Sequence, residues 1–349
     1  MFSSSNQQEF WVTKHLEMKR ILKNFFSRLQ IYPLAGFVIL AALGIYPALS
    51  GSVLHVEILL LAAIYAIFAM SWDILTGYTN EVNFGFAFFI GGAGYLSGAC
   101  NVFLGWPPIL SIPASAVAAG IAGILIGYLT LRLKGPYFAM ATLAFAGILF
   151  KLAFILYKIT GGEEGISGLQ SLTAGPITDF YLVWIVMVGI YILLILYSRS
   201  KHGTILKAIR ADEDVAQSSG INTAYYKVEA FALSGFLAGV GGALYAHAQM
   251  HIGPVMLSGS LSVIVVLLAM IGGMGTIVGP LLGGILLSFL NEALRIVEAY
   301  RIVIYTGVLI VFIYLAPQGL INLELIKQSP RLKRFFFGKE EVHGSSFRS

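Results

Sequence analysis

Residues 54–75, LHVEILLLAAIYAIFAMSWDIL, form one continuous and almost uncharged apolar run. An α-helix rises about 1.5 Å per residue and the hydrocarbon core of a bilayer is about 30 Å thick, so roughly 20 apolar residues are enough to cross it. This run therefore predicts a transmembrane helix. The fold class then depends on how often such runs recur along the chain.

The whole chain is as apolar as this run suggests. Of its 349 residues, 58% are hydrophobic and 11% are charged, whereas soluble domains carry about 25% charged residues. Its mean hydropathy is +0.84. We expect an all-α polytopic membrane protein with about ten transmembrane helices. The other predicted spans are Ile31–Leu49, Val82–Leu104, Ile109–Leu131, Tyr137–Tyr157, Tyr181–Tyr197, Val228–Ala248, Ser260–Gly273, Gly279–Ile296 and Ile302–Ala316.

The distribution of Lys and Arg predicts how these helices are oriented. Positive charges near helix ends are retained on the cytoplasmic side of the membrane. If the N-terminus lies inside, all but four of the 22 Lys and Arg residues fall on the cytoplasmic side, and the exceptions are Lys151, Lys158, Arg295 and Arg301. We therefore expect both termini to be cytoplasmic.

Three regions are predicted from these patterns. Residues 1–30 place apolar residues at helical spacing among five Lys and Arg, which favours a basic amphipathic helix on the inner membrane surface over a disordered basic tail. Residues 31–320 form the transmembrane domain and include a cytoplasmic loop at 198–227. Residues 321–349 form a basic cytoplasmic tail.

Two glycine-rich stretches resemble each other. Phe84–Gly98 reads FGFAFFIGGAGYLSG and Val265–Gly279 reads VVLLAMIGGMGTIVG. They lie five predicted helices apart, which indicates either a 5+5 inverted repeat or chance similarity among small residues. Glycines at membrane depth pack helices closely or line a translocation path. We take six of them as candidates for such a path: Gly91, Gly92, Gly94, Gly272, Gly273 and Gly275.

Motifs for catalysis and cofactor binding are absent from the sequence. It contains no GxxxxGK[ST] phosphate loop, HExxH, CxxC or GxSxG. His247 and His251 have the four-residue spacing of a two-histidine metal site, but no carboxylate or cysteine lies near them in sequence. Cys100 is the single cysteine, so no intrachain disulfide forms. We predict a chain that is not an enzyme and holds no metal or cofactor.

The loop at 198–227 reads SRSKHGTILKAIRADEDVAQSSGINTAYYK and carries signals of local structure. Thr204 is expected to cap one short helix and Asp212 a second, whose first turn holds acidic residues that suit the helix dipole. Gly220 then supplies a left-handed stop. Small and apolar residues lie among the charges, which favours a rigid docking surface standing clear of the membrane.

Several motifs in the same order resemble the transmembrane subunits of bacterial ABC importers for branched-chain amino acids, specifically the larger of the two permease subunits. The resemblance covers most of the chain. Its motifs are LTGYTNEVNFGFAFFIGGAGY at 75–95, LRLKGPYFAMATLAF at 131–145, TGGEEGISG at 160–168, SRSKHGTILKAIRADEDVAQSSGIN at 198–222, AFALSGFLAGVGGALYA at 230–246, IGGMGTIVGPLLGG at 271–284, NEALR at 291–295 and APQGL at 316–320.

The resemblance implies a multi-pass protein of the bacterial inner membrane that works with other subunits. These are a second related permease, two ATPases that bind ATP and Mg, and an extracytoplasmic solute-binding protein; no nucleic acid is implied. It also implies that the loop at 198–227 couples the permease to an ATPase, and we favour 212–220 as the docking helix. The implied coupling residues are Ala208, Arg210, Asp212, Glu213, Asp214, Ala216, Gly220 and Ile221.

Two departures from the family pattern bear on the substrate. Phe86 stands where the family commonly carries histidine, and Glu163 and Glu164 stand where uncharged residues are usual, so amino acids, urea and short amides all stay open. Further candidates for the translocation path lie beside the first glycine stretch and at a predicted helix start: Asn83, Phe84, Tyr137 and Phe138. A stand-alone carrier or channel is the main competing interpretation, and a membrane anchor for cytoplasmic enzymes is a third.

Overall fold

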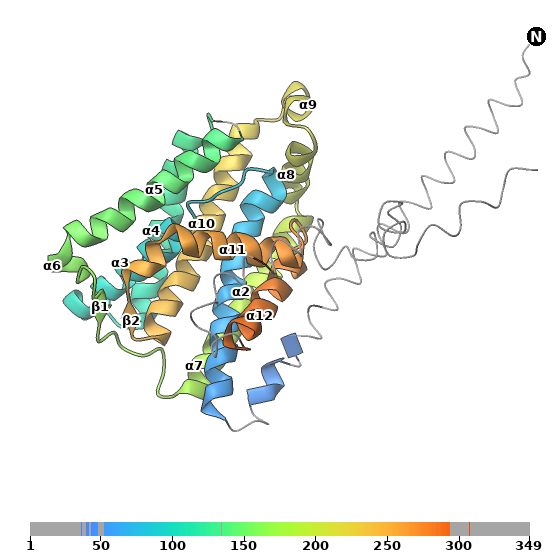
Figure 1. Cartoon of the computed structure of the whole chain (residues 1–349). Helices are drawn as coiled ribbons and strands as arrows, with labels where there is room; N and C mark the ends of the chain where they lie inside the picture. The colour runs from blue at the N-terminus through green and yellow to red at the C-terminus, as the bar shows by residue number, and fades with distance from the viewer. Residues whose placement is uncertain are drawn as a thin grey trace, which may run out of the picture. The chain divides into compact units, whose positions relative to one another are not determined.

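The computed structural model describes residues 52–133 and 135–293, together with residues 36, 40, 41, 43–47 and 307. Within the described residues, six α-helices are long and apolar enough to cross a membrane. Figure 1 shows them as a bundle. They are α2 (Val53–Thr79), α3 (Ala87–Leu104), α4 (Pro108–Thr130), α5 (Pro136–Ile155), α7 (Pro176–Arg199) and α10 (Thr223–Ala248).

Shorter elements connect these helices. Between α7 and α10 the chain forms two helices, α8 (Lys201–Ala211) and α9 (Glu213–Ser218). At the opposite end of α10, β2 (His251–Ile252) pairs antiparallel with β1 (Ile166–Ser167). The remaining elements are α6 (Tyr157–Thr160), the 3-10 helix η1 (Pro254–Leu257), α11 (Gly259–Gly272) and α12 (Val278–Ala293).

The helix α10 is central to the bundle because it packs against α4, α3 and α2. Small residues bring these backbones together. A Cβ atom on Gly235 or Gly242 of α10 would overlap the carbonyl oxygen of Ala119 or Ile90, respectively. In lipid, where no hydrophobic effect drives helices together, close packing of this kind is a main source of association.

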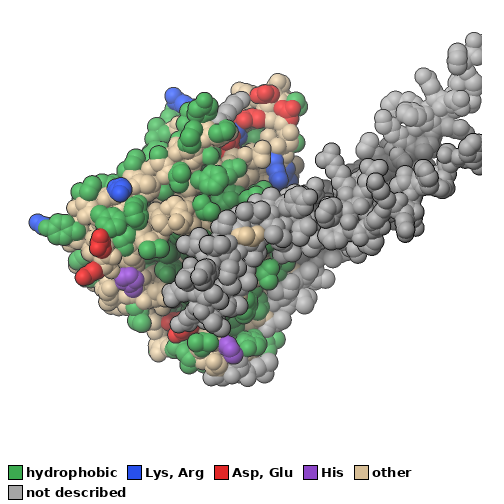
Figure 2. Space-filling view, in the orientation of Figure 1, with side chains coloured by type: hydrophobic (Ala, Val, Ile, Leu, Met, Phe, Trp, Pro, Cys, Tyr) green, Lys and Arg blue, Asp and Glu red, His purple; other side chains and the backbone are tan. Residues whose placement is uncertain are grey.

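Apolar side chains cover the outside of the bundle. Figure 2 shows hydrophobic side chains over the middle of the visible face and most charged ones toward its margins. Large exposed examples are Leu125 and Tyr128 on α4, Ile148 on α5, and Ile185 and Leu196 on α7. Many exposed apolar side chains on several helices are expected of a protein whose solvent is lipid.

The predicted spans agree with the helices through most of the described region. Spans two to seven each correspond to a membrane-length helix, whereas spans eight and nine correspond to the shorter helices α11 and α12, the latter described to Ala293. The first span is described only in part, and the tenth, the amphipathic segment at 1–30 and the tail at 321–349 lie outside the described residues apart from residue 307. The total of ten, the even number and the cytoplasmic termini stay predictions.

The predicted start of the third span is wrong. Residues 82–86 are not helical, and α3 begins at Ala87. The chain leaves α2 at Asn80, whose φ is 64°, and the following backbone bonds to side chains from elsewhere. Phe84 N–H donates to Thr142 Oγ1 at 3.2 Å, and Ala87 N–H donates to Ser262 Oγ at 2.8 Å. These distant partners replace helical hydrogen bonds.

The two glycine stretches differ in local structure. The first lies mostly inside the continuous helix α3, whereas the second ends α11 at Gly272 and turns into α12. Residues that align between 84–98 and 265–279 therefore do not share the same backbone conformation. Whether the halves of the chain form an inverted repeat stays a prediction.

The helix α11 is shorter than a membrane span. Its 14 residues extend about 21 Å at 1.5 Å per residue. Figure 1 shows it crossing α2 and α10. It forms a tight hairpin with α12, because a Cβ atom on Gly283 would overlap the carbonyl oxygen of Leu268.

Candidate functional site

The segment between α7 and α10 is a capped helix pair. Ser200 Oγ accepts a hydrogen bond from Gly203 N–H at 3.3 Å and so caps α8; the predicted cap, Thr204, is wrong and lies in the first turn. Asp212 Oδ1 accepts one from Val215 N–H at 3.0 Å and caps α9, as predicted. The sequence therefore specifies two rigid helices here.

The end of α9 has the glycine stop that the sequence predicts. Gly220 adopts a φ of 84°, a left-handed conformation that costs glycine little. Its N–H bonds to the Gln217 carbonyl at 3.0 Å, and Ile221 N–H bonds to the Ala216 carbonyl at 3.2 Å. These two bonds make a complete Schellman motif, which satisfies the last carbonyl groups of the helix.

The helix α8 does not stand clear of the membrane helices, in contrast to the prediction. Leu206 and Ile209 are buried, and α8 contacts α2, α7 and α10. Lys207 Nζ donates to the Ser198 carbonyl at 3.0 Å and lies 5.4 Å from the ring centroid of Tyr78. Partial burial of the ammonium group lowers the pKa of Lys207, and the positive charge of Arg199 lowers it further.

A buried ion cluster fixes α9 to the bundle. Lys227 Nζ lies 2.7 Å from Glu213 Oε2 at the start of α9 and 2.7 Å from Glu81 Oε1 in the loop between α2 and α3. The Lys227 side chain is 4% exposed. Because an unpaired ammonium in such a place would cost several kcal/mol, roughly, the two carboxylates are required partners. Glu81 and Lys227 are functional candidates that sequence reasoning missed.

The predicted coupling residues divide into an exposed and an anchored group. Ala208, Asp212, Asp214 and Gly220 are exposed, whereas Ala216 is buried and Glu213 is half-buried in its ion pairs. Ile221 is partly exposed and lies in the Schellman motif. Arg210 donates from Nη1 to the Gly77 carbonyl near the end of α2. One side of the pair is thus exposed, and the other is held by specific polar contacts.

The first set of translocation candidates lies around the start of α3. Asn83 is 1% exposed and its Oδ1 accepts from Gly85 N–H at 2.8 Å, while its Nδ2 has no partner among the described residues. Gly91 and Gly94 contact the segment that leads into α11, through Leu257 and Ile252. Gly92 and Phe84 are partly exposed. The small residues here let non-helical backbone pack against α3.

The second set, Gly272, Gly273 and Gly275, lies at the other end of α11. The two sets therefore contact opposite ends of one 14-residue helix rather than a single site. Of the remaining candidates, Phe138 is buried against Phe231 with ring centroids 6.1 Å apart, and Tyr137 is 68% exposed. The structure does not bring Tyr137 to either glycine set by any described contact.

The two histidines with metal-like spacing have separate environments. His247 is fully buried: its Nε2 lies 3.0 Å from Ser97 Oγ and 3.1 Å from Ser111 Oγ, and its Nδ1 lies 2.7 Å from the Gln170 carbonyl. His251 contacts Ser167. Both ring nitrogens of His247 are occupied by hydrogen bonds, so this side chain ties α3, α4 and the 161–175 loop to α10.

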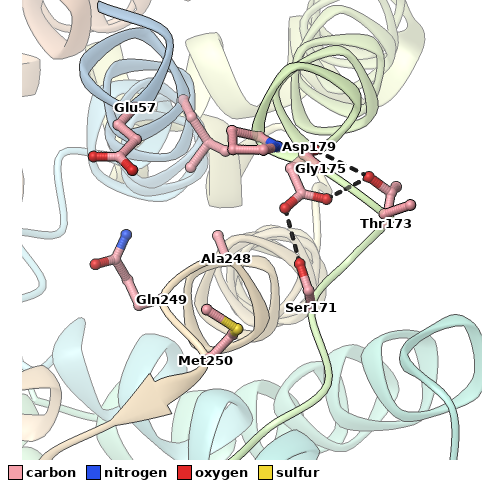
Figure 3. A pocket seen from close by; sticks show the side chains of 11 residues that line it. Glu57, Ser171, Thr173, Gly175, Asp179, Ala248, Gln249 and Met250 are labelled. Carbon is pink, nitrogen blue, oxygen red and sulfur yellow. Dashed lines mark hydrogen bonds between the residues drawn. The ribbon is translucent and has the colours of Figure 1, made fainter. Parts of the chain in front are cut away.

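A pocket of about 380 Å³ lies at the end of α2, α7 and α10 that is remote from α8 and α9. Figure 3 shows the Asp179 carboxylate between the hydroxyl groups of Ser171 and Thr173, which donate at 2.9 and 2.6 Å. Glu57 and Gln249 also line the pocket. Its polar lining contrasts with the apolar sides of the bundle.

The described part of the chain, with six membrane-length helices joined through short connections and an exposed helix pair at one end, defines a multi-pass membrane protein. Residues 54–314 match the family model described as the branched-chain amino acid transport system permease component. The match covers most of the chain, which therefore belongs to this ABC permease family, as the sequence motifs suggest.

Curated relatives agree with this family. The chain is 27% identical over 297 residues to the high-affinity branched-chain amino acid transport system permease protein LivM of Escherichia coli, covering 77% of this chain and 70% of LivM. It is 26% identical over 320 residues to a probable branched-chain amino acid transport permease protein LivH of Methanocaldococcus jannaschii, covering 82% and 96%. The ribose import permease protein RbsC of Haemophilus influenzae is 26% identical over 208 residues, covering 56% and 62%. No solved structure matches the chain.

Proposed function

We propose that the chain is a permease subunit of an ATP-driven importer in a bacterial inner membrane. It pairs with a second, related permease, receives solute from an extracytoplasmic binding protein, and depends on two partner ATPases that bind ATP and Mg. The observation that carries the proposal is the α8–α9 pair. Both helices are capped, and Arg210 and Glu213 bond to groups in the membrane domain.

The exposed side of the α8–α9 pair suits a docking surface. Val215 on α9 is 61% exposed, and Ala208 on α8 is exposed beside charged neighbours. Transmission of force between subunits needs a rigid element with defined positions, which capped helices supply and a solvated loop does not. The charge distribution of the sequence favours the cytoplasmic side for this end of the bundle, where ATP is available.

Replacement of Val215 by aspartate is expected to abolish copurification of the ATPase subunits and to lower uptake by at least about tenfold, because a carboxylate buried without a partner at an interface costs several kcal/mol, roughly. Val215 is a sharper target than its neighbours, since Asp212 caps α9 and Glu213 pairs with Lys227. Affinity purification of the tagged chain from membranes, followed by quantification of the bound ATPase, measures the effect.

Leu133→Asp is the matched control, since Leu133 is 39% exposed in the turn after α4 and takes the same new charge. It is expected to retain the ATPases. Equal ATPase recovery with Val215→Asp and with the unaltered chain would show that α9 is not the docking helix.

For the solute, we propose a neutral amino acid, because the relatives that cover most of this chain are named for branched-chain amino acids. The relatives named for ribose and autoinducer 2 match shorter parts of it. In proteoliposomes with all subunits and the binding protein, labelled leucine, isoleucine or valine is expected to accumulate, and ribose, urea and acetamide are not. Accumulation of one of the latter three instead would reassign the substrate.

The same preparation distinguishes the importer from the competing interpretation, a stand-alone carrier or channel. The chain reconstituted without ATPases is expected to give no solute accumulation above that of empty vesicles. Accumulation by the chain alone, driven by a proton or sodium gradient, would contradict the importer.

A further inference from the structure

The turn between α11 and α12, residues 273–277, has an unusual backbone. Ile277 is 1% exposed and adopts a φ of 61°, a region that β-branched residues rarely occupy because of steric clash. Gly273 and Gly275 also have positive φ, at 114° and 78°. A non-glycine residue in this conformation costs roughly 1–3 kcal/mol and persists only where its surroundings hold it.

A carboxylate on α2 holds this turn. Asp73 is completely buried; its Oδ1 accepts the Gly275 N–H at 2.6 Å and its Oδ2 accepts the Ile277 N–H at 3.3 Å. Both carboxylate oxygens are therefore used on the backbone of the turn, one of them directly at the strained residue.

Arg210 of α8 reaches the same place. Its Nη1 donates to the carbonyl of Gly77, one helical turn after Asp73. A Cβ atom on Gly275 would collide with Arg210 Nη1 and with the Gly77 carbonyl, and a Cβ on Gly77 would collide with Asp73 Oδ1. The end of α2, the strained turn and the helix α8 thus meet within contact distance, and only glycine fits at the two points of approach.

We propose that Asp73, Arg210 and the turn at 273–277 form a latch through which α8 controls the position of the α11–α12 hairpin. The latch rests on the proposed function, because it needs a partner that moves α8. In the arrangement described, Asp73 holds the turn and Arg210 ties α8 to the backbone beside it. When α8 is displaced, Arg210 leaves Gly77, and the stored backbone strain favours release of the turn.

The latch assigns a role to α11, which is too short to span a membrane: it connects the strained turn with α3. The start of α11 contacts α3, because Ser262 accepts from Ala87 N–H and the preceding Leu257 lies beside Gly91, and the end of α11 carries the latch. A displacement at residues 273–277 is therefore carried along a rigid helix of about 21 Å to the start of α3, which follows the loop that contains Asn83. Asp73 and Arg210 are positioning residues in this arrangement, since neither needs to meet the solute.

The test uses the full assembly, the chain with its partner permease, ATPases and binding protein, in proteoliposomes. In Asp73→Asn one acceptor oxygen becomes an NH2 group, and in Arg210→Met the donor is lost. For Asp73→Asn we expect ATPase copurification and ATP hydrolysis to stay within about twofold. For both variants we expect the solute moved per ATP hydrolysed to fall by at least about tenfold, the scale of one lost hydrogen bond to an ionised group.

Two further variants sharpen the test. Arg210→Lys retains one donor and is expected to recover part of the transport per ATP. Arg132→Gln removes a positive charge at the end of α4, where the guanidinium carbon lies 5.2 Å from the Tyr128 ring centroid, and should leave the ratio unchanged. If Asp73→Asn does not fold, the comparison of Arg210→Met with Arg210→Lys still tests the latch.

Amide hydrogen exchange of residues 273–279, measured by mass spectrometry, is an independent readout. Asp73→Asn is expected to speed exchange at Gly275 or Ile277 at least about tenfold, because an asparagine side chain offers one acceptor oxygen to these two N–H groups. Unchanged transport per ATP in Arg210→Met, or hydrolysis and uptake falling in parallel, would overturn the latch and leave the importer standing. Failure of the unaltered chain to bind any ATPase would overturn the importer, and the latch with it.

Discussion

Replacement of Gly239 by leucine is expected to prevent the chain from folding. A Cβ atom at Gly239 would lie 2.7 Å from Ala119 Cβ, 3.0 Å from Ala116 Cα and 3.3 Å from Ala93 Cβ. The clash therefore involves two neighbouring helices, α4 and α3, at the centre of the bundle. Overpacking of a close-packed interior typically costs about 1–3 kcal/mol, and a clash with backbone atoms on rigid helices costs more.

The effect is measured as the yield of monodisperse protein in detergent and as the midpoint of thermal unfolding. Gly189→Leu is the matched control, because Gly189 is also inside a long helix, α7, and a Cβ atom added there would meet nothing within 4 Å. The control is expected to keep the yield and midpoint of the unaltered chain. Normal folding of Gly239→Leu would mean that α10 and α4 are not packed at this depth.

This packing bears on which helices of the bundle can move. Because α10 cannot slide past α4 and α3 without losing close contacts, it serves as the fixed frame of the bundle. The helix begins at Thr223, directly after the α8–α9 pair, and ends at Ala248 beside the polar pocket. Movement of α8 is then more easily taken up by α11 and α12, which hold a strained turn, than by α10.

Hydropathy predicts the membrane helices because the signal is local. In lipid, a run such as 54–75 is expected to be a helix, because every backbone group must form its hydrogen bond within its own segment. The capping signals of Asp212 and Gly220 are equally local, and both are confirmed. The prediction places the cap of α8 four residues too late because Ser200 and Thr204 are both good capping residues, and only the backbone distinguishes them.

The contacts that build the site depend on partners far away in the sequence. Residues 82–86 look apolar enough to extend α3, yet Phe84 N–H bonds to Thr142 and the helix begins only at Ala87, whose N–H bonds to Ser262. Asp73 is recognisable in the sequence as an acid at a helix end, but its partners are about 200 residues further along the chain. Lys227 is likewise inconspicuous in sequence, since nothing local indicates that Glu81 will lie beside it.

Loss of the Lys227 ammonium is expected to destabilise the chain more than loss of any exposed charge. In Lys227→Met the carboxylates of Glu81 and Glu213 lose their shared partner, and Glu81 is itself 10% exposed in its side chain. Removing one member of a buried ion pair typically costs about 3–5 kcal/mol, because the other charge stays buried without compensation. The midpoint of thermal unfolding in detergent measures the loss.

The matched control is Lys201→Met, which removes an exposed lysine from the first turn of α8; exposed charges are worth about 0–1 kcal/mol, so little change is expected. A second comparison separates charge from packing. The double variant Glu81→Gln, Lys227→Met leaves a neutral amide in place of a buried carboxylate, and we expect it to recover part of the lost stability. If the double variant is no more stable than Lys227→Met, packing of the lysine stem rather than its charge joins α9 to the bundle. If it recovers, electrostatics holds the α8–α9 pair, and the pair's attachment will weaken with any process that draws Glu213 away from Lys227.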